Sequence, residues 1–161
     1  MSSYNPQEDM EKFDVFLSFR GEDTGSNFAG HLYAVLEQKG IYTFKDDVVE
    51  HETGENISPE LLKTIQESRC SIVILSKDYA SSARCLSGLA KIVECMGTWG
   101  RILPIFYHVE PSHVRKQSGS YEEAFKRHEA DPKHKQNVKS WRDALTTVAN
   151  LSGWHVEENK T

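Results

Sequence analysis

Residues 13–24 read F-D-V-F-L-S-F-R-G-E-D-T. The first half of this stretch is an apolar run rich in Phe, Val and Leu, which is typical of a strand covered on both faces. The run then breaks into a charged turn around Gly21, followed by residues that favour the start of a helix. Open α/β sheets form their binding sites where strands end in such loops, at the carboxyl edge. We therefore predict that the loop 20–24 forms one wall of a functional pocket.

The composition is that of an ordinary globular domain. The 161 residues suffice for one domain with a buried core. No apolar run approaches the ~20 residues of a membrane span, and residues 1–10 lack the apolar segment of a signal peptide. The net charge of −5 argues against a nucleic-acid surface. Cys70, Cys85 and Cys95 show no C-x-x-C spacing, which indicates a reduced, intracellular protein with structural thiols.

Apolar runs and helical periodicities alternate along the chain, with short connections between them. Strands are predicted at 13–19, 41–44, 70–75 and 101–107, with a weaker fifth strand at 112–118. Helices are predicted at 26–39, 58–68, 81–97, 120–129 and 138–151, and a short helical turn at 111–116. Pro104 requires the fourth strand to be irregular or near an edge at that point. The alternation predicts an α/β domain whose five-stranded parallel sheet has the order 2-1-3-4-5, with helices on both faces.

The predicted domain covers residues 12–154, between a polar N-terminal tail at 1–11 and a C-terminal tail at 155–161. The stretch after Gly153 is polar and is expected to fray. Trp141 and Leu145 are expected to dock the last helix onto the sheet. Six aliphatic residues are expected to be buried at the sheet centre: Val15, Leu17, Ile41, Ile72, Ile74 and Ile105.

Blocks of residues along the chain add to this pattern. They are F-D-V-F-L-S-F-R-G-E-D-T at 13–24, H-L-Y at 31–33, G-I with T-F within 40–44, I-S-P-E-L-L at 57–62, S-K-D-Y-A-S-S at 76–82, F-Y at 106–107, P-S with V-R-K-Q within 111–117, and N-L-S-G-W at 150–154. In this order they resemble the plant Toll/interleukin-1 receptor (TIR) domain, as found in TIR-type NLR intracellular immune receptors. The resemblance covers residues 12–154.

The resemblance implies a flavodoxin-like fold at the N-terminus of an intracellular immune receptor, or in a related short adaptor. It implies association with other TIR domains, of the same or of a paired receptor, through helix faces, and a cytoplasmic or nuclear location. In many relatives the assembled domain cleaves the nicotinamide–ribose bond of NAD and releases signalling nucleotides. NAD is therefore the substrate or ligand that the resemblance suggests. No required cofactor, metal, nucleic acid or membrane is expected.

The family's catalytic motif is altered in this chain. The resemblance places the catalytic Glu in a Trp-Cys-Leu-x-Glu-Leu motif after the third strand, and the corresponding segment here is R-C-L-S-G-L at 84–89. Arg84 therefore stands at the Trp position and Gly88 at the Glu position. Cleavage of the glycosidic bond builds oxocarbenium character on the ribose, which a carboxylate stabilises and a glycine does not. We expect NAD cleavage to be lost or impaired.

Other acids are candidates to replace the missing carboxylate. Glu94 lies six residues beyond the glycine, about 240° round the helix, and so faces elsewhere. Glu50, Glu52 and Glu55, in the loop after the second strand, leave a rescue open. The segment 48–55 contains no Lys or Arg, although relatives commonly carry one there that suits dinucleotide phosphates. Its acids repel a pyrophosphate.

Part of the family's nucleotide pocket is nevertheless retained. The resemblance assigns four residues to this pocket: Arg20, Gly21, Ser82 and Arg84. From the residues alone, Arg20 either contacts an anionic ligand or pairs with Glu22 or Asp23 in its own turn. The pocket is therefore expected to persist without its catalytic carboxylate.

The association surfaces are altered as well. His31 lies on the first helix, where relatives place a Ser-His pair used in helix-to-helix association, and the Ser position is Gly30. On a second association surface, relatives often have a small residue where Glu122 stands. We expect weak self-association centred on the helix of His31.

Other classes of site fit the sequence less well. A phosphoacceptor receiver domain needs acids at the ends of its first and third strands, and the third strand here ends in Leu75. His108 and His113 lack a Cys or an acid to complete a metal site, and no base accompanies Cys85 or Cys95 as a nucleophile. Three hypotheses remain: a non-catalytic TIR interaction module, an NAD-cleaving TIR enzyme with an unusual catalyst, and a generic nucleotide-binding domain. The altered motif favours the first over the second.

Overall fold

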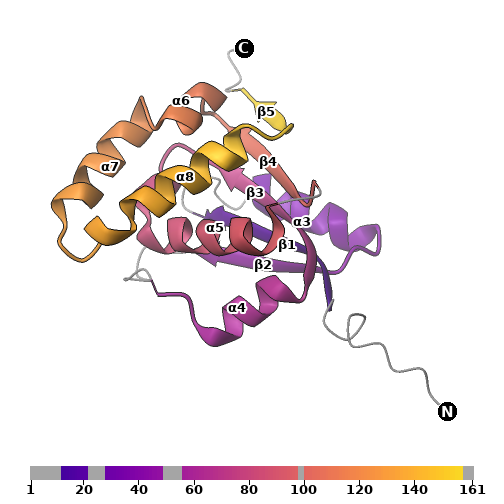
Figure 1. Cartoon of the computed structure of the whole chain (residues 1–161). Coiled ribbons are helices and arrows are strands. Elements are labelled where there is room, and N and C mark those ends of the chain that lie inside the picture. The colour runs from indigo at the N-terminus through magenta and orange to yellow at the C-terminus, as the bar shows by residue number, and fades with distance from the viewer. Residues whose placement is uncertain (1–11, 22–27, 49–55, 98–99, 158–161) are drawn as a thin grey trace.

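The computed structural model describes residues 12–21, 28–48, 56–97 and 100–157. Its centre is a sheet of five parallel strands in the order β2-β1-β3-β4-β5 (Figure 1). The strands are β1 (Phe13–Arg20), β2 (Thr43–Val48), β3 (Ser68–Leu75), β4 (Ile102–Tyr107) and β5 (Trp154–Val156). The predicted α/β, flavodoxin-like architecture with strand order 2-1-3-4-5 is confirmed.

Helices cover both faces of this sheet. One face is covered by α3 (Phe28–Gln38). The other face is covered by α4 (Pro59–Gln66), α5 (Ala83–Met96) and α8 (Val138–Ala149). The remaining helical elements are α6 (Pro111–Lys116), α7 (Ser120–Ala130) and the 3-10 turns η1 (Tyr79–Ser81) and η2 (Lys135–Asn137). Within the described part of the chain, every helix is too short or too polar to cross a membrane.

Two hydrophobic clusters lie on opposite faces of the sheet, because successive side chains of a strand point to opposite sides. The cluster under α3 contains five of the predicted core residues: Val15, Leu17, Ile72, Ile74 and Ile105. The larger cluster joins the other sheet face to α4, α5 and α8, and it includes buried Trp141 and Leu145. The predicted docking of the last helix is therefore confirmed.

The prediction for Ile41 is wrong in part. This residue is only half-buried, at the border of the α3 cluster, and it precedes β2 instead of lying in it. Gly40 has φ of +78°, the left-handed conformation that ends many helices. The Ile41 N–H then donates to the Leu36 carbonyl oxygen at 2.9 Å, so this group completes the helix end. The strand consequently starts at Thr43, two residues later than predicted.

The predicted fifth strand is also misplaced. Residues 112–118 fall in α6 and the turn after it, because Pro111 favours a helix start and lacks the N–H that a ladder needs. The fifth strand is β5, in the stretch after Gly153 that was expected to fray. It pairs with β4 only from Ile105 onward. At Pro104, the described pairing of β4 is with β3, and the pairing with β5 has not yet begun, so a residue without an N–H is tolerated there.

Two serines begin the helices that border the site. Ser58 Oγ accepts a hydrogen bond from the Leu61 N–H at 3.1 Å, and Pro59 occupies the first turn of α4. Ser82 Oγ accepts from the Cys85 N–H at 3.0 Å and caps α5. Each hydroxyl satisfies an N–H that would otherwise have no helical partner. These caps fix where the first turn of each helix lies.

Candidate functional site

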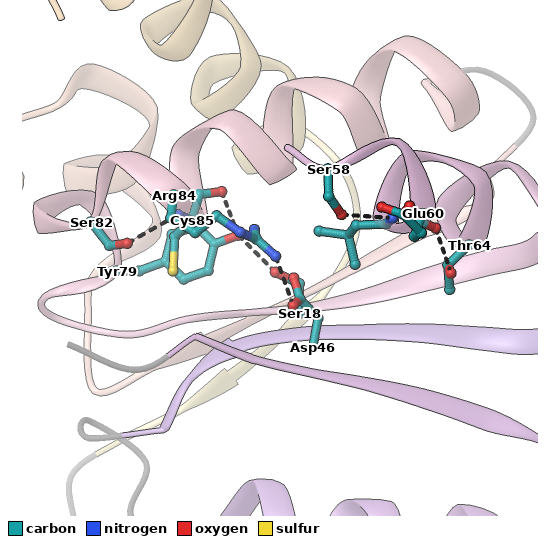
Figure 2. A network of polar contacts seen from close by, with 10 residues as sticks. Ser18, Asp46, Ser58, Glu60, Thr64, Tyr79, Ser82, Arg84 and Cys85 are labelled. Carbon is teal, nitrogen blue, oxygen red and sulfur yellow. Dashed lines mark hydrogen bonds and ion pairs between the residues drawn. The ribbon is translucent and has the colours of Figure 1, made fainter. Parts of the chain in front are cut away.

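Two of the predicted pocket residues, Ser82 and Arg84, lie at the start of α5, and Arg84 points toward the sheet (Figure 2). The parallel register places Ser18 of β1 opposite Asp46 of β2. Both side chains point to the face that α5 covers, where they meet Tyr79 and Arg84. Arg20 ends β1 two positions beyond Ser18. The sheet register and the start of α5 therefore bring distant parts of the sequence into one polar layer.

A buried ion pair holds Arg84 in this layer. Its Nη2 donates to Asp46 Oδ1 at 2.9 Å. The side chains of Arg84 and Asp46 are only 11% and 10% exposed, respectively. A guanidinium–carboxylate contact out of water depends strongly on both partners, because either charge alone is costly to bury. Arg84 is therefore a fixed part of the site, anchored to β2 across 38 positions of sequence.

The same guanidinium lies beside Gly88. A Cβ on Gly88 would lie 3.1 Å from Arg84 Nη1 and 4.0 Å from Ile57 Cδ1, the only described atoms within 4 Å outside the adjoining residues and the backbone of the helix itself. Nη1 is buried and has no hydrogen-bond partner within the described part of the chain. We call the buried place where Gly88, Arg84 Nη1 and Ile57 Cδ1 meet the Gly88 recess. It presents a cationic donor, and no carboxylate projects from position 88.

A second polar contact fixes the base of α5. The Tyr79 and Ser18 hydroxyls lie 2.9 Å apart, and the Tyr79 hydroxyl also donates to the Cys85 carbonyl at 3.3 Å. Burial raises the pKa of Tyr79 well above its usual value. Burial likewise raises the pKa of the Cys85 thiol to about 12, which leaves it protonated and unsuited to nucleophilic attack. The expectation that Cys85 packs in the core is confirmed.

The remaining pocket residues have distinct positions. Gly21 is approached by the Asp47 carboxylate, which would contact any Cβ at position 21. Ser82 uses its hydroxyl oxygen to cap α5. Arg20 has an interaction partner in the structure. The two partners that the sequence suggests, Glu22 and Asp23, lie outside the described residues. The two interpretations of Arg20 therefore stay predictions.

Of the acids that could replace the missing catalytic Glu, the structure describes only Glu94, and Glu94 does not lie beside position 88. Glu94 is exposed, pairs with Lys91 at 3.3 Å and lines a separate groove between α5 and α8. Glu50, Glu52 and Glu55 lie outside the described residues. The prediction that Glu94 faces elsewhere agrees with this geometry. A rescue from the loop after β2 remains a hypothesis.

The predicted association residues lie on two different surfaces. Gly30 and exposed His31 are on α3, and a Cβ on Gly30 would meet nothing within 4 Å. Glu122 is exposed on α7, where its carboxylate lies 3.9 Å from the ammonium group of Lys126. These positions are accessible to a partner.

The described residues also include a groove of about 880 Å³ between α5 and α8. Its rim carries the internally paired charges Lys91–Glu94 and Lys139–Asp143, and Ile57 lies at one side. It does not include the predicted pocket residues. No group of three potential metal-binding side chains occurs in the part of the chain that the structure describes.

The sequence interpretation missed two contributors to the site. Asp46 was not predicted as a site residue, although period-2 alternation places it on the same strand face as Phe44, toward the covered side. Ile57 had no signal beyond its place before the Ser58 cap. Neither contact with the α5 segment follows from local pattern, because each depends on how α5 is placed over β2 and α4.

Comparisons with known proteins agree on one family. The family profile described as "TIR domain" matches residues 12–161. The chain is 54% identical over 149 residues to Disease resistance protein RPV1 of Vitis rotundifolia, across 92% of this chain and 10% of that protein. It is 48% identical over 151 residues to TMV resistance protein N of Nicotiana glutinosa, across 92% of this chain and 13% of that protein. It thus spans about a tenth of the length of these relatives.

A solved structure gives the same result for the fold. It is described as "Structure of the activated Roq1 resistosome directly recognizing the pathogen effector XopQ (TIR domains)". The match has a TM-score of 0.77 and 50% sequence identity. It covers 90% of this chain and 88% of the matched chain.

Proposed function

This chain belongs to the TIR domain family of plant disease resistance proteins, and we propose that it is a signalling module that associates with other TIR domains and does not cleave NAD. The observation that carries this proposal is the Gly88 recess. The position that the family motif gives to a catalytic Glu has no side chain, and a guanidinium fixed by Asp46 lies beside it. A site of this composition lacks the carboxylate that would stabilise positive charge on a ribose.

Binding of a nucleotide without cleavage is part of the proposal. The resemblance assigns Arg20, Gly21 and Ser82 to the family's pocket, and this assignment is supported by the position of Arg20 at the carboxyl end of β1, where α/β domains bind ligands. The buried ion pair places Arg84 in the same layer. The pocket then acts as a recognition or regulatory site, in the cytoplasm or the nucleus, and signalling passes through the assembled domains.

Association is proposed to be weak and to centre on α3. His31 is exposed there, beside a position 30 that offers no side chain. The solved relative is described as part of a resistosome, which supports TIR partners as the class to test. On α7, the carboxylate of Glu122 adds charge to the second surface and weakens close packing.

Nicotinamide release from NAD, measured on concentrated protein, tests the proposal directly. A TIR domain that carries Trp and Glu at the two motif positions serves as the positive control under the same crowding. We expect release from the present chain to equal that of a buffer blank. Turnover above the blank would instead support the NAD-cleaving hypothesis, with Glu50, Glu52 and Glu55 as the first residues to substitute.

A further inference from the structure

We propose that Asp46 is a positioning residue, whose carboxylate holds the Arg84 guanidinium against position 88 and so closes the Gly88 recess to ligands. A nucleotide then reaches position 88 only after this ion pair has opened. The inference rests on the proposed nucleotide binding and concerns how the same site is controlled. We call the form with the guanidinium on Gly88 closed, and the form with the guanidinium displaced open.

The first argument is that Arg84 already fills the place in front of position 88. A Cβ at this position would lie 3.1 Å from Nη1, which is shorter than the ~3.5–4.0 Å that is optimal between non-bonded carbon atoms. Nη1 itself is buried. No ligand atom therefore fits between Nη1 and position 88, and any group that contacts this position must displace the guanidinium.

The second argument is that Asp46 fixes where the guanidinium lies. Nη2 of Arg84 donates to Asp46 Oδ1 at 2.9 Å, as Figure 2 shows, whereas Nη1 has no hydrogen-bond partner in the described part of the chain. The backbone of Asp46 is itself held in place, because β2 is paired with β1 along its whole length. The arginine side chain is long and has many rotamers, so its contact with β2 selects the one that covers Gly88.

The third argument concerns the cost of opening. The side chains of Arg84 and Asp46 are only 11% and 10% exposed, respectively. Separating two charges in such a place is unfavourable, because each loses its partner before it is hydrated. The closed form is therefore the major one. A ligand that binds only the open form has its apparent affinity reduced by the open fraction, so an open fraction of about 1% weakens binding about a hundredfold.

The first experiment measures the accessibility of Arg84 without any nucleotide. Phenylglyoxal modifies accessible guanidinium groups, and mass spectrometry of peptides gives the rate at each arginine. In the unmodified chain Arg84 should react at least about tenfold more slowly than exposed Arg127, and in Asp46→Asn this protection should be lost. Arg101, which donates to three backbone carbonyls, should react at the same rate in both chains and thereby shows that the fold is intact. Unchanged protection of Arg84 in Asp46→Asn would overturn the proposal.

The second experiment measures NAD binding by isothermal titration calorimetry. Arg84→Ala combined with Asp46→Asn removes the ion pair and keeps the formal net charge at −5, so long-range repulsion of the ligand is unchanged. We expect this double variant to bind NAD at least about tenfold more tightly than the unmodified chain. The matched control is Lys139→Ala with Asp143→Asn, which removes an exposed pair of the same 2.9 Å length and should leave the affinity unchanged.

The outcomes separate this inference from the proposed nucleotide binding. An NAD affinity that is unchanged or weaker in the double variant overturns the closure of the site. If NAD binds to none of the chains while Asp46→Asn still exposes Arg84, the role of Asp46 in holding Arg84 stands and the proposed nucleotide binding fails. If the double variant does not fold, Asp46→Asn decides, and its NAD affinity should exceed that of Asp143→Asn, which carries the same change of charge.

Discussion

Replacing Asp46 by asparagine should destabilise the domain more than any comparable change at an exposed ion pair. The Asp46→Asn substitution keeps the shape of the side chain and an oxygen that can accept from Arg84 Nη2, but it removes the negative charge. The guanidinium then remains in an environment where its side chain is only 11% exposed, without its ionic partner. The prediction therefore isolates the charge of Asp46 from its volume.

The expected magnitude follows from burial. Removing one partner of a buried ion pair costs about 3–5 kcal/mol. The lower end applies here, because each side chain keeps about a tenth of its exposure. The amide oxygen retains a hydrogen bond to a charged donor, which restores about 1 kcal/mol. We therefore expect a loss of about 2 kcal/mol in the free energy of unfolding, or ~4–8 °C in melting temperature for a domain of this size.

Asp143→Asn is the matched control. The Lys139–Asp143 contact has the same 2.9 Å distance, but its side chains are 87% and 66% exposed. Exposed pairs contribute at most about 1 kcal/mol and commonly less, so this variant should lose ~0.5 kcal/mol or less. Urea denaturation at pH 7, followed by far-UV circular dichroism, measures both losses if the denaturant dependence stays unchanged.

A double-mutant cycle completes the test. Asp46→Asn combined with Arg84→Met should cost less than the sum of the two single variants, because the second change removes the charge that the first leaves buried. The reasoning is refuted if Asp46→Asn costs no more than Asp143→Asn, or if the double variant is simply additive. Either result would mean that water or another group replaces Asp46 at the guanidinium.

Three further predictions concern activity, acid stability and association. Nicotinamide release should be absent in the unmodified chain and low in Gly88→Glu, because Arg84 Nη1 lies where it can neutralise the new carboxylate. Release should be highest in Gly88→Glu with Arg84→Trp. Any other ranking contradicts the assignment of these positions. Burial lowers the pKa of His128, whose Nε2 lies 2.7 Å from the Ala80 carbonyl oxygen. The neutral imidazole therefore contributes fully to stability above pH 6.5, and this contribution is lost as the pH falls through the lower pKa that His128 has in the folded state. Urea midpoints between pH 8 and pH 5 should therefore fall less in His128→Gln than in the unmodified chain, and parallel curves would disprove this. Light scattering over a concentration series should show weak association that His31→Ala weakens further, whereas a tight dimer unaffected by His31→Ala would exclude α3 as its centre.

The sequence was sufficient for the parts of the fold that depend on local pattern. Continuous apolar runs identify β1 and β3, since both are covered on two faces. Ser58, Pro59 and Ser82 mark helix starts because their side chains act on the adjacent turn. β5 was missed because three residues are too few to show alternation, and its pairing depends on β4, which lies far from it in the sequence.

The site was predictable in its membership but not in its geometry. Motif positions identify Arg84 and Gly88, yet the contact of Arg84 with Asp46 requires the register of β2 against β1 and the position of α5 above them. No local rule supplies either. Asp46 could be assigned to the covered face by alternation with Phe44, but its partner could not be chosen from the sequence, because Arg84 lies 38 positions away on another element.

The structure joins the two changes in the family motif into one arrangement. A Cβ at position 88 would lie 3.1 Å from Arg84 Nη1, so the guanidinium in its present place fits most easily beside a glycine. A carboxylate restored at 88 alone would meet the guanidinium and be neutralised by it. An aromatic ring restored at 84 alone would remove the guanidinium that contacts the Asp46 carboxylate. Restoring the motif therefore involves three positions, because the contact of Asp46 changes together with the residues at 84 and 88.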